Sequence, residues 1–165
     1  MSIRWVLFAW VGFFQLQIFA TPLDEVRNKF PYFETETEID LYLTQLEADA
    51  SALASVYKGA LYMFKSKFAV APTAKYKFFK KGKNFINAAC LSQPNALEIR
   101  FVRLIFQYQL PSFLGYNDHK ESDFKFIMTH FAQCNLSAEK KKKMIDQMLQ
   151  LEKLESDKIK QIKNL

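Results

Sequence analysis

The chain has 165 residues, of which 50% are hydrophobic and 16% aromatic, with only 4 glycines and 5 prolines. This composition excludes a disordered or low-complexity chain, because enough apolar surface is present to form the core of a single domain. The net charge of +6 is moderate and comes from 23 Lys and Arg against 17 Asp and Glu. The shortage of turn-forming residues favours long helices joined by short loops.

The first 20 residues have the pattern of a secretory signal. Arg4 precedes an apolar run over residues 5–14, and the small residue Ala20 precedes Thr21. The run is short for a membrane span, which needs about 20 residues. We therefore expect residues 1–20 to be a signal peptide that is cleaved between Ala20 and Thr21. An uncleaved anchor and a buried first helix are the alternatives.

Cleavage would remove Arg4 and no acid, leaving 22 Lys and Arg against 17 Asp and Glu, a net charge of +5. The expected location is the periplasm or the extracellular space, where nucleic acid is not an expected partner. Weak contact with an anionic membrane surface is compatible with this charge. Cys90 and Cys134 could pair in such an oxidising compartment. Two independent core thiols are the favoured interpretation, since free cysteine is commonly buried.

Helical signals begin directly after the leader. A short helix is expected over residues 23–30, and Thr35 with Glu38 fits a capping box for the next helix. Apolar residues then recur in steps of three and four as far as Phe64. We expect a break near residues 49–51, because Asp and Ser cap helices better than they extend them. The following helix should end near Val70.

Gly59 lies inside this second stretch, where glycine costs about 1 kcal/mol relative to alanine. Close packing of another helix is the expected reason. The next helix is predicted over residues 73–91. Its inner face should hold Tyr76, Phe79, Gly82, Phe85, Ile86 and Ala89, and its outer, solvated face should hold Lys77, Lys80, Lys81, Asn84 and Asn87.

A helix over residues 96–110 combines apolar residues with a few charges. Arg100 and Arg103 share one stripe with Gln107, so we expect them to form a basic edge. Glu98 instead has apolar helical neighbours. It should be buried and paired with a Lys, Arg or Tyr from another helix, in a structural role, because a buried carboxylate needs a partner.

Pro111 ends this helix, and the loop that follows offers Leu114 and Tyr116 as an apolar contact beside Gly115, which should adopt an unusual backbone angle. Asn117 or Asp118 should cap a helix that runs to about residue 133. Ser137 should cap a final helix whose first turns carry Lys140, Lys141, Lys142 and Lys143. These cations oppose the helix dipole, so they are either solvated or face an acidic partner.

The fold class expected from these elements is all-α, an irregular stack of five to seven helices. Residues 21–155 should form a single helical domain, and residues 156–165 a frayed helical tail.

The spacing of Gly82, Ile86, Ala89 and Pro94 resembles the second helix and closing proline of a tetratricopeptide-type repeat. This likeness is partial and covers one hairpin over residues 53–94, with a loop inserted. With the segments "VYKGA" and "EIRFVRLIFQYQLPSFLGY" and the leader, the chain also resembles a family of small uncharacterised exported helical proteins of Bacteroidota, over nearly the whole mature chain. That family implies no activity and no functional residue.

The sequence contains no recognisable catalytic, cofactor or metal motif. His119 and His130 could share a helix face, but a metal site needs three or four convergent ligands. Cys90 or Cys134 would act as a nucleophile only with a histidine brought close by the fold. Glu98 lacks an obvious second acid for glycosidase chemistry.

We therefore expect a non-catalytic exported interaction module that binds a protein or peptide in the cell envelope, without a cofactor or metal. Its predicted contact residues are Arg100, Arg103, Leu114, Tyr116 and Lys140 to Lys143. The alternatives are an envelope-surface protein held by basic helix faces and an enzyme of unrecognised type.

Overall fold

The computed structural model describes residues 20–165, so the predicted leader, apart from Ala20, lies outside the described residues. Residues 20–165 contain helices and no strand, which confirms the all-α class. The eight α-helices exceed the expected five to seven. The elements are α1 (Pro22–Lys29), α2 (Glu36–Gln45), α3 (Ala52–Phe68), α4 (Pro72–Ser92), α5 (Leu97–Gln109), the 3-10 helix η1 (Ser112–Leu114), α6 (Lys120–His130), α7 (Ala138–Leu149) and α8 (Ser156–Lys163).

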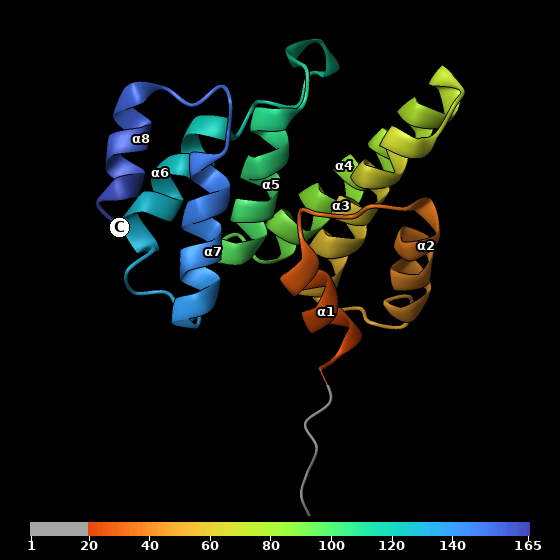
Figure 1. The fold of residues 1–165 in the computed structure, drawn as a ribbon, viewed down its shortest axis with the longest axis horizontal. Helices are drawn as coiled ribbons and strands as arrows, with labels where there is room; N and C mark the ends of the chain where they lie inside the picture. Colours follow the sequence, from red (N-terminus) through yellow and green to blue (C-terminus); the bar gives the residue numbers. More distant parts are fainter. Residues whose placement is uncertain (1–19) are drawn as a thin grey trace, which may run out of the picture.

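Helix α5 stands near the middle of the molecule (Figure 1). The hairpin of α3 and α4, with α1 and α2 beside it, lies on one side, and α6, α7 and α8 lie on the other. One connected cluster of buried apolar side chains runs through both sides. None of the helices in this range is both long and apolar enough to cross a membrane.

The predicted helix starts at Thr35, Ser51 and Ser137 are confirmed. Their hydroxyl oxygens accept hydrogen bonds from the backbone N–H groups three residues ahead, at 3.2, 3.1 and 3.2 Å respectively. The cap at Ser51 confirms the break between α2 and α3. Each of these bonds satisfies a donor that the first turn of a helix leaves free.

Helices α3 and α4 form the most extensive helix pair and touch at two glycines. A Cβ atom added to Gly59 would lie 2.9 Å from the backbone oxygen of Gly82, and one added to Gly82 would lie 2.7 Å from the backbone oxygen of Gly59. Any side chain at either position would force the helices apart. This confirms that Gly59 is needed for close packing.

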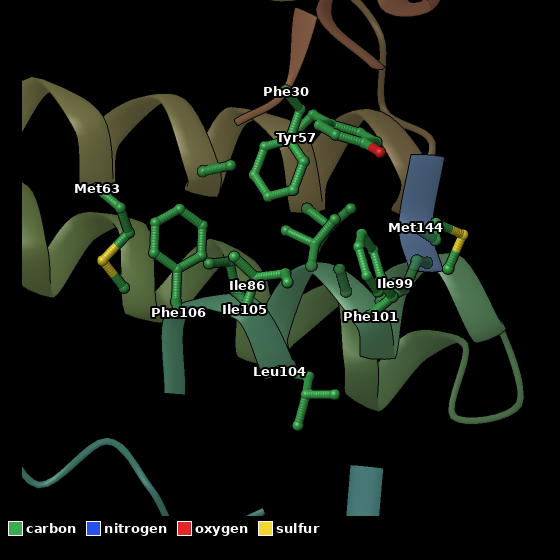
Figure 2. Packing of buried hydrophobic residues seen from close by; sticks show 14 of the residues in the cluster. Phe30, Tyr57, Met63, Ile86, Ile99, Phe101, Leu104, Ile105, Phe106 and Met144 are labelled. Carbon is green, nitrogen blue, oxygen red and sulfur yellow. The ribbon is translucent and has the colours of Figure 1, made fainter. Parts of the chain in front are cut away.

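The core gathers around α5, which is buried at every position from Phe101 to Tyr108. Phe30, just after α1, meets Phe101 and Phe106 edge to face, with ring centroids 6.4 and 6.1 Å apart. Figure 2 shows this contact on one side of α5, while Leu104 extends from the other side. Because α5 is covered on both sides, any charged residue on it must find a partner within the fold.

One expectation about the C-terminal half is wrong. Neither Asn117 nor Asp118 caps α6, whose N-cap residue is His119 without a side-chain bond. Residues 156–163 form the expected helical segment, α8, in which Ile162 is buried and Lys158 donates to Glu121 at 2.6 Å; the expected fraying of this segment stays a prediction.

Candidate functional site

An open groove of about 630 Å³ lies where the α4–α5 turn meets the end of α6 and the loop before α7. Its walls come from three segments that are far apart in sequence, so the sequence analysis did not identify it. The apolar lining residues are Leu53, Ala96, Leu97, Ile99, Phe126 and Leu136, and the polar ones are Gln93, Asn95, Glu98, His130, Gln133, Cys134 and Asn135.

Four side-chain amides stand around this apolar surface. They belong to Gln93 and Asn95 in the α4–α5 turn and to Gln133 and Asn135 in the α6–α7 loop. All four residues are exposed, and no partner within residues 20–165 hydrogen-bonds their amide groups. Each amide can donate and accept, so the groove can bind a ligand that offers both kinds of group. The repeated pattern Gln-x-Asn at the two turns is the sequence signal that was missed.

Glu98 lies at the edge of the groove, and it is paired with side chains of other helices, as the sequence predicted. Its Oε1 accepts from Arg27 Nε at 2.7 Å and from the Tyr57 hydroxyl at 2.8 Å, and its Oε2 accepts from Arg27 Nη2 at 2.6 Å. The side chains of Arg27 and Glu98 are only 15% and 12% exposed, respectively. The predicted pairing is thus confirmed, and the carboxylate is partly rather than fully buried.

This cluster shifts the proton affinity of Glu98's partners. The bond to Glu98 raises the pKa of Arg27, while burial, together with the negative charge of Glu98, raises the pKa of Tyr57 well above its usual value. Both carboxylate oxygens are occupied by donors from α1 and α3, so Glu98 ties three helices together.

Arg100 and Arg103 do not form the exposed basic edge that was expected, because both turn toward Asp123 on α6. Arg103 is 7% exposed and binds Asp123 through Nε at 2.6 Å and Nη2 at 2.8 Å. Arg100 Nη1 adds a third bond at 3.1 Å. Asp123 itself is fully buried. Arg100, Arg103 and Gln107 do share one stripe of α5, as predicted. The stripe faces Asp123 inside the protein and not an external partner.

The expected apolar contact at Leu114 and Tyr116 is wrong for Tyr116, which is buried. Its ring packs edge to face on Phe79, and its hydroxyl donates to Asn87 Oδ1 at 3.2 Å. Leu114 is half-buried. Gly115 has φ of 58°, which confirms the expected backbone angle. This turn leaves Phe113, rather than Tyr116, exposed to solvent.

The lysine run at the start of α7 is largely engaged within the chain. Lys143 donates to the backbone oxygen of Asn28, and Lys141 donates to that of Ala132 at 3.0 Å. Lys140 lies 3.9 Å from a carboxylate oxygen of Asp24. Of the four lysines, Lys142 is exposed and the other three are half-buried. The run therefore secures α7 to α1 and the preceding loop, and it is not a free basic face.

His130 and Cys134 line the same groove, but their polar atoms bind nearby backbone. His130 Nδ1 lies 2.8 Å from the backbone oxygen of Phe126, and Cys134 donates to that of Phe131 at 3.0 Å. The thiol hydrogen is thus directed to a carbonyl and not to the imidazole. Both Cys90 and Cys134 are free thiols, as favoured from the sequence. Residues 20–165 contain no cluster of three metal-ligating side chains.

Comparison with known proteins adds no relative: no family model, curated protein or solved structure matches this chain. The groove and its surroundings must therefore be interpreted from their own chemistry.

Proposed function

We propose that this chain is a non-catalytic binding module of the cell envelope that holds an extended segment of a protein or peptide partner in the groove. The observation that carries the proposal is the set of four unpartnered amides around an apolar surface. An extended peptide offers backbone N–H and C=O groups that match amide side chains, together with side chains for the apolar surface.

The groove also has the rigidity that favours binding without a large ordering cost. Glu98 joins α5 to α1 and α3 on one side. Asp123 joins α5 to α6 on the other side through Arg100 and Arg103. The two turns that carry the amides therefore extend from helices whose spacing is fixed by buried ion pairs.

The proposed location is outside the cytoplasm, after cleavage between Ala20 and Thr21. Thr21 caps α1 by accepting a hydrogen bond from the backbone N–H of Asp24 at 3.1 Å. A cut at this site would leave that cap intact, which supports the proposal. Protein recovered from the envelope should have the mass of a chain that starts at Thr21. Retention of Met1 in protein recovered from the cytoplasm would contradict it.

Site-directed photo-crosslinking in the cell tests the groove. A benzoylphenylalanine probe at Gln133 should give one discrete adduct, whereas the same probe at the exposed Asn117, outside the groove, should not. The adduct should weaken when Asn95 and Asn135 are both changed to Ala and persist when Asn84 and Asn117 are changed instead. Losing two hydrogen bonds at about 1 kcal/mol each should weaken binding roughly 30-fold.

The partner identified in this way should then be cut into synthetic peptides and titrated against the purified protein. One peptide should bind with the same dependence on Asn95 and Asn135. Equal adducts from both probe positions, or peptide binding that ignores both asparagines, would reject the groove as the binding site.

A further inference from the structure

The hairpin of α3 and α4 carries an unusual concentration of positive charge. Residues 52–92 contain eight lysines and neither Asp nor Glu. Since the whole chain has a net charge of +6, the remainder carries −2. The molecule is therefore electrically polarised, with its positive end on this hairpin.

Many of these lysines have no acidic partner. Lys65 pairs with Asp40, and Lys58 and Lys83 donate to backbone oxygens. For the other five, no carboxylate within residues 20–165 lies close enough for an ion pair; they are Lys67, Lys75, Lys77, Lys80 and Lys81. All five are exposed and lie in the half of the hairpin nearest its turn.

Exposed apolar side chains accompany this charge. Val70, in the turn between α3 and α4, is 94% exposed, and Phe113, in η1, is 85% exposed. Tyr76, in the first turns of α4, was expected on the inner face, but this is wrong: it is 59% exposed. In Figure 1 the α3–α4 turn and the η1 segment both project at the upper edge of the molecule.

The η1 segment is fixed to the hairpin rather than free to move independently. Lys83 on α4 donates to the backbone oxygen of Gly115 at 2.9 Å. Tyr116 packs on Phe79, also on α4, with ring centroids 6.3 Å apart. Phe113 is therefore presented on the same rigid unit as the lysines.

We propose that this edge docks the protein onto an anionic phospholipid surface, with Val70 and Phe113 entering the interface and the neighbouring lysines lying over the headgroups. Apolar side chains flanked by lysine suit a membrane interface, because the chains enter the acyl boundary while the ammonium groups meet lipid phosphates. Each lysine near such a surface contributes about fivefold to binding. The net negative remainder of the molecule would be repelled, which orients the docked protein.

This site is independent of the amide-rimmed groove, which lies at the other end of α4. An envelope-surface protein held by basic helix faces was one alternative expected from the sequence. The basic face proposed here lies on the α3–α4 hairpin and not on the lysine run of α7. A polyanion such as duplex DNA could bind the same lysines, but its charged backbone would make no favourable contact with the exposed apolar side chains of Val70 and Phe113. The apolar tips therefore favour the bilayer.

Vesicle co-sedimentation of the mature chain, residues 21–165, tests the contribution of the lysines. Binding is expected to vesicles that contain phosphatidylglycerol, to fall with added salt, and to be absent with phosphatidylcholine alone. Changing Lys67, Lys75 and Lys77 together to Gln should weaken binding on the order of 100-fold. A control with the same net charge changes the exposed Lys153, Lys160 and Lys163 to Gln, and it should bind within about twofold of the original protein.

Fluorescence tests the apolar tip. Both tryptophans of the chain, Trp5 and Trp10, lie outside residues 20–165. A Phe113→Trp substitution therefore introduces the only tryptophan of this range. Its emission should shift to the blue with anionic vesicles and be quenched by brominated lipid. The control is Leu91→Trp, because Leu91 is 82% exposed near the other end of α4; its emission should not change.

Three results would overturn the proposal. The first is equal weakening by the two lysine triplets. The second is an unchanged spectrum of the Phe113→Trp protein on vesicles that it binds. The third is binding to duplex DNA that matches vesicle binding in strength and lysine dependence, which would identify a general polyanion surface.

Discussion

Asp123→Ala should be among the most damaging single substitutions in this protein, because it removes the counter-ion of two guanidinium groups. The carboxylate is fully buried and accepts bonds of 2.6, 2.8 and 3.1 Å from Arg103 and Arg100. Removing one partner of such a pair costs about 3–5 kcal/mol, since the other charge stays buried. Total stabilities are about 5–15 kcal/mol, so a large part of the free energy of unfolding would be lost.

Thermal and urea unfolding followed by circular dichroism measure this loss. For a domain of this size the melting temperature should fall by about 6–20 °C. The matched control is Asp118→Ala, which removes an exposed acid just before α6 and should change stability by no more than about 0.5 kcal/mol.

A double-mutant cycle separates the ion pair from simple loss of packing. Arg103→Met combined with Asp123→Ala should cost less than the sum of the two single changes, by about 0.5–3 kcal/mol, because the cycle removes both buried charges. Additive losses, or a loss below about 1 kcal/mol for Asp123→Ala alone, would show that the pair does not hold α5 to α6.

Three further outcomes are expected. Gly59→Ala should destabilise the protein by about 1–3 kcal/mol, because the new Cβ would lie 2.9 Å from the backbone oxygen of Gly82; an unchanged urea midpoint would refute this close contact. Glu98→Ala should cost about 3–5 kcal/mol by leaving Arg27 without its main partner, whereas the exposed Glu47→Ala should have little effect in the same melts. Burial raises the pKa of Tyr116, so the folded state keeps a phenolic proton that the unfolded state loses above about pH 10. The contribution of Tyr116 to the free energy of unfolding is therefore fully present below that pH and is lost as the pH rises further. Tyr116→Phe should reduce this loss of stability at high pH. Identical pH profiles of stability for the two proteins would exclude Tyr116 as a cause.

Local sequence signals predicted most of the fold. Thr35, Ser51 and Ser137 were identifiable as caps because each bonds to a backbone group three residues away. Gly59 was correctly linked to close packing because its cost inside a helix requires a compensating contact. These features depend on neighbours in the chain, so the sequence contains them.

The candidate groove was not predictable in the same way. Each of its two turns shows the pattern Gln-x-Asn, but the sequence does not reveal that residues 93–95 and 133–135 line one surface. That proximity exists only because the α5–α6 pair brings the two turns together. A polar turn on a protein surface is common and predicts no function by itself. The proposed binding role depends on the second polar turn, which lies across the groove.

By itself, the sequence determined the helical class, the caps and the need of Glu98 for a partner. The tertiary structure decided which partners were used, since Glu98 meets Arg27, which is 71 residues away, and Arg103 meets Asp123, which is 20 residues away. It also turned Tyr116 inward and left Phe113 outside. The physical reason is that helix formation is governed by spacing along the chain, whereas the burial of a charge or ring depends on which surfaces the packed helices bring into contact.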